Sequence, residues 1–503
     1  MSRMERQRSV VRELVEADEA LIAASDGVVA RLQLGPATTG TFEVRDPATD
    51  SAIARVPDLG PDDALSAVAA AHAAGLEWSR TSPRARADVL RRWYDVLVEN
   101  TDDLALLISR EMGKPLTESR AEVGYGADFV RWYSEEAVRP AGTTRELPAG
   151  GAQLLTRRAP VGLSVLITPW NFPLAMATRK IAPALAAGCS VVVKPSDLTP
   201  LTTLFAAELA ARAGVPAGLI NVVTTTSASA FSETVLRDPR VRKVSFTGST
   251  GVGTILLRLA AENVLRSSME LGGNAALLVF DDADLDRAVE EAFKAKLRNG
   301  GQSCIAANRI YVQDGIADAF IEGLTEKMGR LRIGSGLGRD VGMGPLINGR
   351  AAASMVALVD DAVRRGADVR TGGLAPSSPG HFFEPTVLAD VPPDAELANT
   401  EIFGPIAAVQ RFTSEDEAVA KANATELGLA GYVFTESLDR ALNVADRLET
   451  GLVGINQGVP SNAAAPFGGV KQSGLGREGS AEGLEEYQEV RFYNIARRAS
   501  PGP

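Results

Sequence analysis

The chain is poor in cysteine and histidine: only Cys189, Cys304, His72 and His381 occur among its 503 residues. A zinc site needs about three or four Cys, His or carboxylate ligands. No such cluster is visible in the sequence, so we expect no metal. His72 lies in an Ala-rich helical segment and His381 in a Gly/Pro-rich loop, and we interpret both as structural, which argues against a Ser-His-Asp triad. If catalysis is covalent, a cysteine is the expected nucleophile.

Long apolar runs and dense basic runs are also absent. No stretch approaches the roughly 20 apolar residues that span a bilayer, so we expect no membrane segment. The net charge of -11 argues against nucleic-acid binding, because displacing counterions from phosphates needs a basic face. Residues 1–40 mix Arg with Glu and Asp and lack the apolar core of a secretory signal. We therefore predict a polar N-terminal leader on a cytoplasmic protein.

From about residue 160, apolar segments typical of strands alternate with helical segments. GLSVLIT, SVVVKPS and RKVSFTG are typical of buried strands, and helical stretches of roughly 10–15 residues separate such segments. This alternation predicts βαβ units and a doubly wound parallel sheet that binds ligands at the carboxyl ends of its strands. A second series of this kind begins near residue 284. The fold class is therefore α/β, with a parallel-sheet cofactor domain and a second α/β catalytic domain.

Three further segments are candidates for chemistry. Cys304, in NGGQSC, follows a Gly-rich helix end and is expected in a loop, although a lone cysteine is usually buried and inert. Cys189 opens an apolar strand and fits that inert description. Burial of Glu270, in MELGGN, would raise its pKa and make it a general base, or it could be a buried salt-bridge partner. Asn171, in PWNFP, could donate to an oxyanion or form a turn.

PWNFP, MELGGN and GQSC together resemble the aldehyde dehydrogenase superfamily. Cys304 lies 34 residues after Glu270 and 133 after Asn171, which fits that family. Further matching segments are KPS at 194–196, FTGST at 246–250, EIFGP at 401–405 and PFGGVKQSGLGREG at 466–479. The resemblance covers the chain from about residue 45 to its end.

The resemblance implies a role for each of the matching residues. A thiolate on Cys304 would attack the aldehyde, and Asn171 with the Cys304 backbone N–H would hold the oxyanion. After hydride transfer, Glu270 would activate water to hydrolyse the thioester. Lys180 and Glu478 match positions that relay protons. The thiolate must form for attack, but no helix N-terminus precedes Cys304, so its activation is not explained by the sequence.

The resemblance also implies an NAD(P) cofactor, although no GxGxxG motif is present. Gly248–Gly253 follows a strand and opens a helix, which is a context for phosphate binding. The expected cofactor residues are Trp170, Lys194, Ser196, Asp197, Gly248, Ser249, Leu271, Glu401 and Phe403. Asp197 could accept from a ribose 2′-OH and would repel a 2′-phosphate, so we expect NAD rather than NADP, although Lys194 and Ser196 could bind that phosphate. Thr225 and Thr226 stand where many relatives have Gly, which puts the shape of the adenine pocket in doubt.

Within the superfamily the chain is most similar to succinate-semialdehyde dehydrogenases, which oxidise that substrate to succinate. Arg179, Arg298 and Ser461 match the positions that grip its distal carboxylate, and Phe172 and Phe467 would wall the pocket. Two guanidiniums near the thiol would select a short ω-carboxy aldehyde, whereas either Arg alone could be a surface or salt-bridge residue. One methylene changes binding by only about 1–3 kcal/mol. Glutarate semialdehyde or a broader range of aliphatic aldehydes therefore stays an alternative.

The chemistry could also differ from hydrolytic oxidation in two ways. CoA-acylating relatives typically lack the Glu at the Glu270 position, so its presence favours hydrolysis. A non-catalytic binding member of the fold is disfavoured because every catalytic position is filled. Some relatives carry a second Cys two residues after the nucleophile, but Ala306 stands there, so no disulfide switch is expected.

The resemblance finally implies a domain layout and a small β oligomerisation arm. We expect a leader at 1–40, a cofactor domain at 41–146 and 166–275, a catalytic domain at 276–472, and the arm at 147–165 and 485–503. Relatives assemble as dimers or tetramers through such an arm. A homodimer or homotetramer is therefore expected, with a small-molecule aldehyde as the other partner.

Overall fold

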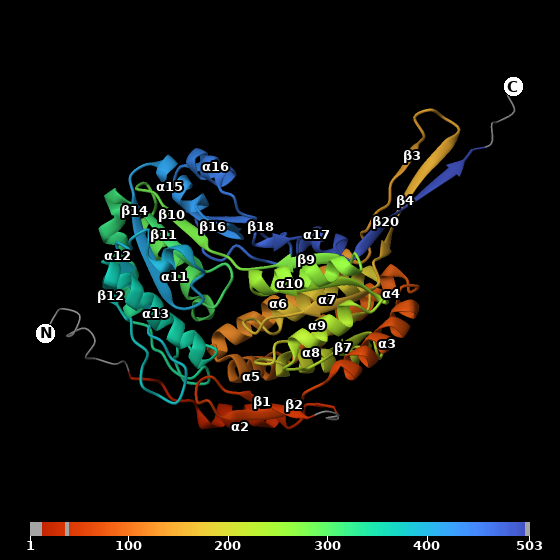
Figure 1. Ribbon diagram of the computed structural model, residues 1–503, viewed down its shortest axis with the longest axis horizontal. Coiled ribbons are helices and arrows are strands. Elements are labelled where there is room, and N and C mark those ends of the chain that lie inside the picture. Colours follow the sequence, from red (N-terminus) through yellow and green to blue (C-terminus); the bar gives the residue numbers. More distant parts are fainter. Residues whose placement is uncertain (1–12, 36–39, 498–503) are drawn as a thin grey trace.

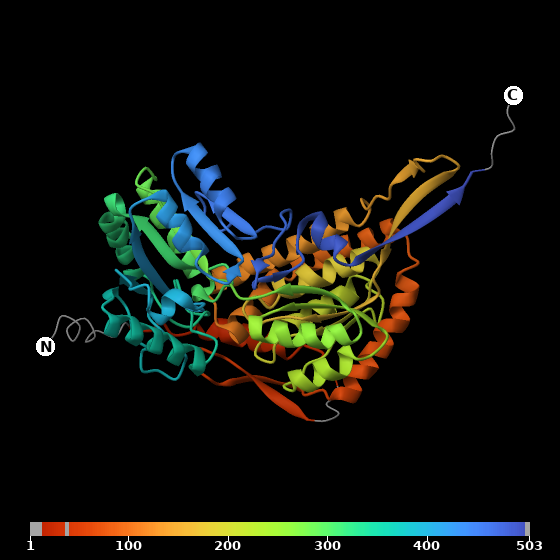
Figure 2. The same ribbon diagram turned by 45° about the horizontal axis from the view of Figure 1, so that its top comes forward.

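The computed structural model describes residues 13–35 and 40–497. Two α/β units lie side by side, and a β arm projects from one of them (Figures 1 and 2). The unit on the left in Figure 1 holds a seven-stranded sheet, and the unit on the right holds a six-stranded sheet. The predicted α/β class, with two units and a β arm, is confirmed.

The six-stranded sheet has the order β19-β9-β8-β5-β6-β7, and only β19 runs antiparallel to its neighbour. Its strands are β5 (Leu163–Ile167), β6 (Val191–Lys194), β7 (Ile220–Val222), β8 (Val241–Thr247), β9 (Arg266–Glu270) and β19 (Gly474–Leu475). The chain builds outward from β5 to β7 on one side and then continues through β8 and β9 on the other. This reversal creates a topological switch point, beside which ligands bind in such sheets.

Helices cover both faces of this sheet, which explains why its strands are apolar throughout. Successive side chains of a strand point to opposite faces. In β6, Val192 packs with α3, α9 and α10, whereas Val191 and Val193 pack with α4 to α8. These helices are α3 (Pro61–Trp78), α4 (Pro83–Glu99), α5 (Thr101–Met112), α6 (Leu116–Glu136), α7 (Ala175–Ala187), α8 (Leu201–Arg212), α9 (Ala228–Leu236) and α10 (Thr250–Glu262).

The seven-stranded sheet has the order β12-β13-β14-β11-β10-β16-β17, and only β12 is antiparallel. Its strands are β10 (Ala275–Val279), β11 (Ala307–Gln313), β12 (Asp368–Thr371), β13 (Thr386–Ala389), β14 (Ile406–Phe412), β16 (Ala430–Phe434) and β17 (Leu452–Ile455). Leu277 faces α11 and α12, whereas Leu278 faces α15 and α16. The helices of this unit are α11 (Leu285–Leu297), α12 (Asp314–Gly329), α13 (Gly349–Arg365), α14 (Glu396–Asn399), α15 (Glu415–Asn423) and α16 (Leu438–Arg447).

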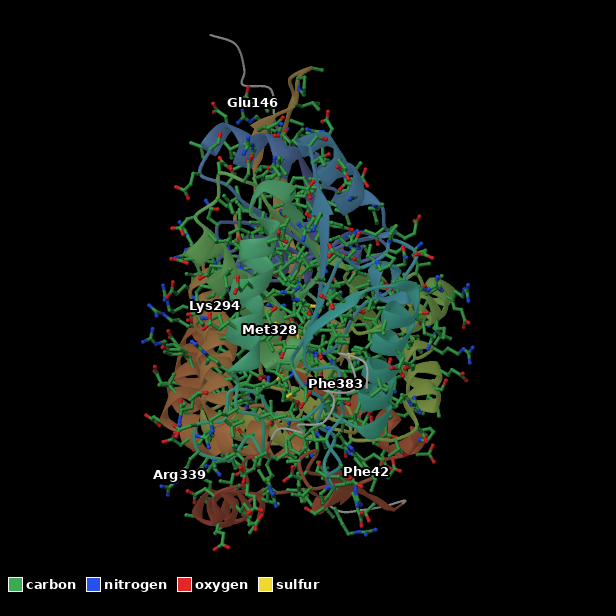
Figure 3. All side chains as sticks on the ribbon, turned by 90° about the vertical axis from the view of Figure 1, so that its left-hand side faces the viewer. Phe42, Glu146, Lys294, Met328, Arg339 and Phe383 are labelled. Atoms are coloured by element: carbon green, nitrogen blue, oxygen red, sulfur yellow. The ribbon has the colours of Figure 1, made fainter. Side chains whose placement is uncertain are left out.

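The arm is a three-stranded antiparallel sheet of β20 (Gln488–Ala496), β4 (Ala152–Pro160) and β3 (Thr144–Glu146). Figure 1 shows it extending away from both units, and Glu146 marks its position at the top of Figure 3. β4 ends at Pro160 and β5 of the six-stranded sheet begins at Leu163, so the change of sheet falls slightly before the predicted boundary at 165.

The N-terminal segment packs along the bottom of the molecule in Figure 1. Part of the predicted leader, residues 1–12 and 36–39, lies outside the described residues. Within the described part, α2 (Glu19–Val29) contacts α5, and Arg339 Nε lies 2.8 Å from a carboxylate oxygen of Asp18. The remaining elements are β1 (Thr41–Arg45), β2 (Ala52–Pro57), η1 (Arg298–Gly301), β15 (Leu427–Gly428), β18 (Val470–Lys471) and α17 (Ser480–Glu485).

Among residues 13–35 and 40–497, no helix is long and apolar enough to cross a membrane. The same residues contain no group of three or more His, Cys, Asp or Glu side chains arranged to hold a metal ion.

Candidate active site

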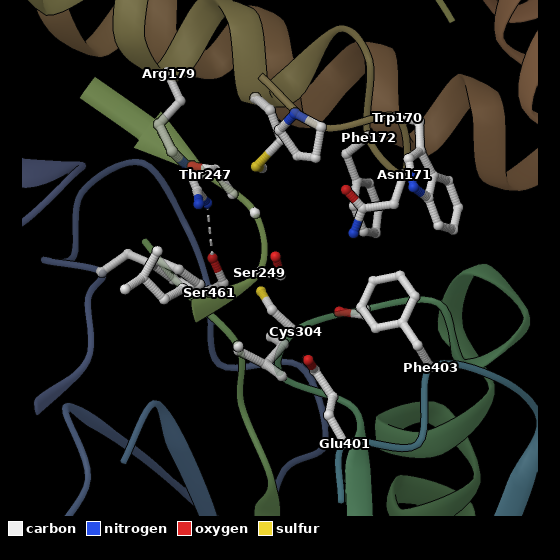
Figure 4. Close-up of a pocket in the computed structure, with 18 of the residues that line it drawn as sticks. Trp170, Asn171, Phe172, Arg179, Thr247, Ser249, Cys304, Glu401, Phe403 and Ser461 are labelled. Atoms are coloured by element: carbon white, nitrogen blue, oxygen red, sulfur yellow. Dashed lines mark hydrogen bonds between the residues drawn. The ribbon is translucent and has the colours of Figure 1, made fainter. Parts of the chain in front are cut away.

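A cavity of about 220 Å³ lies where the carboxyl ends of β5, β8 and β9 meet the loops of the second unit. Predicted site residues that line it are Trp170, Asn171, Phe172, Arg179, Gly248, Ser249, Leu271, Arg298, Cys304, Glu401, Phe403, Ser461 and Phe467. In Figure 4, Cys304 lies between two groups of side chains. We name two ends of the cavity after the roles that the sequence predicts: the substrate end is Arg179, Arg298 and Ser461, and the cofactor end is Trp170, Glu401 and Phe403 together with the loop of Gly248 and Ser249.

Cys304 is placed by a tight backbone turn that only small residues permit. Asn299, Gly300 and Gly301 all have φ between 57° and 76°, in the left-handed region that favours glycine. A Cβ on Gly273 would lie 2.1 Å from the Cys304 carbonyl oxygen, so the loop after β9 packs directly on the loop of Cys304. The thiol is thereby fixed at the wall of the cavity.

The surroundings of the Cys304 thiol disfavour its ionised form. Burial raises its pKa to about 12, and Glu401 and Glu270 act in the same direction, whereas Arg179 and Arg298 oppose them. Cys189 is fully buried in the core and its pKa is raised to about 11 by burial, which agrees with the prediction that it is a core residue. Burial therefore raises the pKa of both thiols, and the two differ in that Cys304 lines the cavity whereas Cys189 does not.

Asn171 follows β5 and is held by hydrogen bonds from two directions. Its backbone carbonyl accepts from Lys114 Nζ and from Asn299 Nδ2, both at 2.9 Å. Its side-chain Nδ2 donates to the Gln302 carbonyl at 3.1 Å, two residues before Cys304. Lys114 is itself buried and paired with Glu122 at 2.5 Å. These contacts fix the Asn171 amide beside the loop of Cys304, which is the position predicted for an oxyanion donor.

Glu270 is the last residue of β9 and lies behind the cavity wall rather than in its lining. It is 3% exposed, and burial and then Glu478 hold its pKa well above the usual range. Its Oε2 has no hydrogen-bond partner among the described residues. A Cβ on Gly468 would lie 2.9 Å from Oε1, so glycine leaves the carboxylate room. A buried, unsatisfied carboxylate with a raised pKa is suited to general-base chemistry near neutral pH.

Lys180 and Glu478 form a buried pair next to Glu270. Lys180 Nζ donates to Glu478 Oε1 and, at 3.0 Å, to Ser245 Oγ. Glu478 Oε2 lies 3.7 Å from Arg179 Nη1. The pair therefore connects the general-base candidate with a cation at the substrate end.

The cofactor end offers backbone hydrogen-bond donors and the aromatic rings of Trp170 and Phe403. α10 begins directly after β8, and its N-cap Ser249 makes no side-chain cap, so the first-turn N–H groups of this 13-residue helix can bind an anion. Trp170 and Phe403 meet edge to face with centroids 5.5 Å apart. Burial raises the pKa of Glu401 to about 7, and its Oε1 accepts from Gly273 N at 3.1 Å. These residues fit the phosphates, ring and ribose of a dinucleotide.

Three predicted cofactor residues, Lys194, Ser196 and Asp197, lie outside this cavity, at the carboxyl end of β6. Lys194 Nζ donates to the Pro195 carbonyl at 3.1 Å; its burial lowers its pKa, and Asp197 acts against that shift. The Thr225–Thr226 loop after β7 is tied to Asp58, which accepts from Thr226 N at 2.9 Å and from Thr226 Oγ1 at 2.7 Å. The loop that departs from the family pattern is therefore anchored by its own threonine.

At the substrate end, Arg179 is 2% exposed and Arg298 caps α11. Arg179 Nη2 lies 3.3 Å from Ser461 Oγ, as the dashed line in Figure 4 shows. The Arg298 guanidinium makes no hydrogen bond or salt bridge with any residue that the structure describes; its Cζ lies 4.9 Å from the Phe172 ring centroid. Phe467 lies 4.3 Å from the Arg179 guanidinium.

Comparison with known proteins decides the family. The aldehyde dehydrogenase family model matches residues 35–493. The chain belongs to the aldehyde dehydrogenase family. It is an NAD(P)-dependent enzyme that oxidises a small-molecule aldehyde, as the order of its motifs predicted.

Relatives of this dehydrogenase match it over nearly their whole length. A succinate-semialdehyde dehydrogenase of Paenarthrobacter nicotinovorans is 53% identical over 86% of this chain and 97% of its own. The NADP(+) succinate-semialdehyde dehydrogenase of Escherichia coli K12 is 47% identical over 90% of this chain and 94% of its own. The crystal structure of a Staphylococcus aureus betaine aldehyde dehydrogenase with NAD+ gives a TM-score of 0.92 at 34% identity, covering 95% of this chain and 98% of that one.

The dehydrogenase cavity also contains residues that the sequence did not reveal. These are Tyr125, Pro169, Met176, Thr247, Gly272, Ser303 and Ile305. Pro169, Thr247, Gly272 and Ser303 stand inside quoted motifs, although no role was assigned to them. Ile305 directly follows GQSC, and Met176 lies three residues after PWNFP. Tyr125 on α6 stands in no motif, and no signal in the sequence separates it from an ordinary helix residue.

Proposed function

We propose that this dehydrogenase oxidises succinate semialdehyde to succinate. The observation that carries the proposal is the pair of guanidiniums at one end of the cavity, with Ser461 beside them and Cys304 next to them. Glu478 lies 3.7 Å from Arg179, whereas Arg298 has no salt bridge among the described residues and Glu118 acts on it only at longer range. The substrate end therefore keeps one cation available for a distal carboxylate. The relatives from Paenarthrobacter nicotinovorans and Escherichia coli are named succinate-semialdehyde dehydrogenases, which supports this substrate.

In the proposed reaction, the Cys304 thiol loses its proton to water and attacks the aldehyde carbon as a thiolate. The Asn171 amide and the Cys304 backbone N–H stabilise the oxyanion of the thiohemiacetal. NAD(P), when bound at the cofactor end, accepts the hydride. Glu270 then removes a proton from water, whose oxygen attacks the thioester and displaces the Cys304 thiolate. Lys180 and Glu478 lie where they can carry the released proton away from Glu270.

We further propose that NAD is preferred to NADP. Asp197 lies close enough to Lys194 to act against the lowering of its pKa, and a carboxylate there would repel a 2′-phosphate. The NADP(+) relative from Escherichia coli is the opposing indication. Comparing kcat/KM for the two cofactors in the wild type and in Asp197→Ser tests the choice. A shift toward NADP in the variant supports the role of Asp197, and an unchanged ratio contradicts it.

Glutarate semialdehyde is the alternative substrate. It places the same carboxylate one methylene farther from the aldehyde, and one methylene is worth only about 1–3 kcal/mol of discrimination. We expect overlapping turnover, with succinate semialdehyde ahead.

The predictions of a homodimer or homotetramer, of a cytoplasmic location and of the domain boundaries stay predictions. We propose that β20 is the interface strand, because Val490, Phe492 and Ile495 on it are largely exposed in the single chain. Light scattering of the intact protein and of Phe492→Asp would test this, with a smaller particle expected for the variant.

The function itself is tested by following NADH and NADPH formation at the nicotinamide absorbance with purified protein. Succinate semialdehyde is compared with butanal, which has the same number of carbons and no carboxylate. We expect kcat/KM for succinate semialdehyde to be at least about 100-fold higher, as for a pair of charge-assisted hydrogen bonds. Equal turnover of butanal would contradict the carboxylate site while leaving the family assignment intact.

A further inference from the structure

Tyr125 lies at the centre of the substrate end although no sequence motif contains it. Its side chain comes from α6 and lines the cavity. The hydroxyl lies 2.5 Å from Ser461 Oγ and accepts a hydrogen bond from Arg179 Nη2. The same Arg179 nitrogen lies 3.3 Å from Ser461 Oγ, so the three polar groups form one cluster.

The ring of Tyr125 also contacts both cations of this end. The Arg298 guanidinium carbon lies 5.3 Å from the ring centroid, and that of Arg179 lies 5.4 Å away. Both distances are within the range of a cation–π interaction. The ring is held in turn by Phe129, which meets it edge to face at 5.1 Å. A fixed aromatic ring therefore contacts both guanidiniums.

The hydroxyl hydrogen of Tyr125 determines which ligand groups this cluster can bind. Because the oxygen already accepts from Arg179, the hydroxyl hydrogen is the group that remains to be donated. In this structure Ser461 Oγ is its only neighbour of suitable distance among the described residues, and Ser461 can itself donate. An anion entering the cluster would be offered hydrogen atoms by two guanidiniums, a phenol and an alcohol.

We propose that Tyr125 is a specificity-determining residue that donates a hydrogen bond to the distal carboxylate of the substrate and holds Arg298 facing it. This proposal rests on the proposed function and adds a donor to it. A carboxylate has two oxygens and about four acceptor sites, which suits this set of donors. An aldehyde that ends in a methyl group offers these donors no acceptor and leaves Arg298 without an ionic partner, and sites built to bind a polar group reject analogues that lack it.

The test separates the hydroxyl from the ring. Tyr125→Phe keeps the ring that contacts both guanidiniums and removes only the donor. We expect its KM for succinate semialdehyde to rise about tenfold or more, as for loss of a hydrogen bond to a charged group, with little change in kcat. Its kcat/KM for butanal should stay at the wild-type value or rise. The dissociation constant of succinate, measured by calorimetry, should weaken by a similar factor.

Two further comparisons keep the test decisive. Tyr94→Phe removes a hydroxyl from a partly buried tyrosine on α4, away from the cavity, and should match the wild type in every assay. Tyr125→Trp keeps an aromatic ring with an N–H donor and should fall between wild type and Tyr125→Phe in its preference for the carboxylated aldehyde. If circular dichroism shows that Tyr125→Phe does not fold, Tyr125→Trp replaces it in the test.

The outcomes distinguish this proposal from the proposed function. If the wild type prefers succinate semialdehyde and Tyr125→Phe keeps the same preference and succinate affinity, the proposal for Tyr125 is overturned and the proposed function stands. If the wild type shows no preference over butanal, both are overturned. A lost preference in Tyr125→Phe with unchanged butanal turnover supports both.

Discussion

The two ends of the cavity recognise their ligands by different physical means. The substrate end uses side chains: two guanidiniums, with Tyr125 and Ser461 beside them. The cofactor end relies on the backbone, through the first turn of α10 and the close approach of Gly272 and Gly273, with Glu401 as its buried carboxylate. We therefore expect single substitutions to change the selectivity for the aldehyde more readily than they change the binding of the cofactor phosphates, which the backbone of α10 would hold.

Cys304 is shared by both ends, so its removal has the largest expected effect. Cys304→Ala should lower kcat by at least about a thousandfold with any aldehyde, because the covalent intermediate cannot form. Cys189→Ala is the matched control and should retain turnover, since that thiol is buried in the core. Steady-state assays of both variants measure this. Comparable losses in the two would break the assignment of the nucleophile.

Glu270 acts after the hydride has left, so its loss should separate the two halves of the reaction. Glu270→Gln should lower steady-state turnover by about 10²–10⁴-fold, the range of general-base catalysis, while leaving a single burst of reduced cofactor. Rapid mixing with absorbance detection measures the burst. Full steady-state turnover in this variant would contradict the role of Glu270.

At the substrate end, Arg298→Ala should raise the KM for succinate semialdehyde by roughly 10–100-fold, since charge-assisted hydrogen bonds are lost. The KM for cofactor should not change, because Arg298 belongs to the other end. Arg91→Ala, on the exposed face of α4, is the control. A similar rise in KM for butanal would show that Arg298 shapes the cavity rather than binding charge.

Cys304 lies between the two ends of the cavity, and the pKa of its thiol can be tested by varying the pH. With a raised pKa of about 12, the thiolate fraction of the free enzyme grows by about tenfold per pH unit below that value. Alkylation of Cys304 by iodoacetamide, without cofactor or substrate, should therefore accelerate steadily from pH 7 to pH 10. A plateau near neutral pH would show that the resting thiol is ionised and would contradict the effect of its burial.

The smallest expected effect is at the cofactor end. Glu401→Gln keeps the size of the side chain and its acceptor oxygen for Gly273 N, so we expect a rise in the cofactor KM of less than about tenfold. The ratio of kcat/KM values for succinate semialdehyde and butanal should stay constant. A changed ratio would show that the two ends are coupled through Cys304.

Much of this site could be predicted from the sequence because its residues stand at the ends of strands. Asn171, Gly248 and Glu270 follow or end parallel strands, and parallel strands bring their carboxyl ends to one edge. The catalytic motifs are local segments of this kind. The alternation of apolar strands and helices predicted the α/β class for the same reason, since both faces of each sheet are covered.

Other features depend on contacts that the sequence does not encode locally. Tyr125 reaches the site from α6, and its partner Ser461 stands 336 positions later in the chain. Glu122 supports the loop of Asn171 from the same helix, through Lys114 and the backbone N–H of Leu174. The raised pKa of Cys304 follows from its burial and from Glu401, which stands 97 positions later in the chain. None of these features has a spacing or composition that marks it.

We expect Cys304 to carry the acyl group of an anionic aldehyde and Glu270 to release it. The most direct test is mass spectrometry of Glu270→Gln after mixing with succinate semialdehyde and NAD, followed by acid quenching and digestion. We expect a succinyl group on the Cys304 peptide and none on the Cys189 peptide. An unmodified Cys304 peptide, in a sample that has formed reduced cofactor, would contradict this expectation.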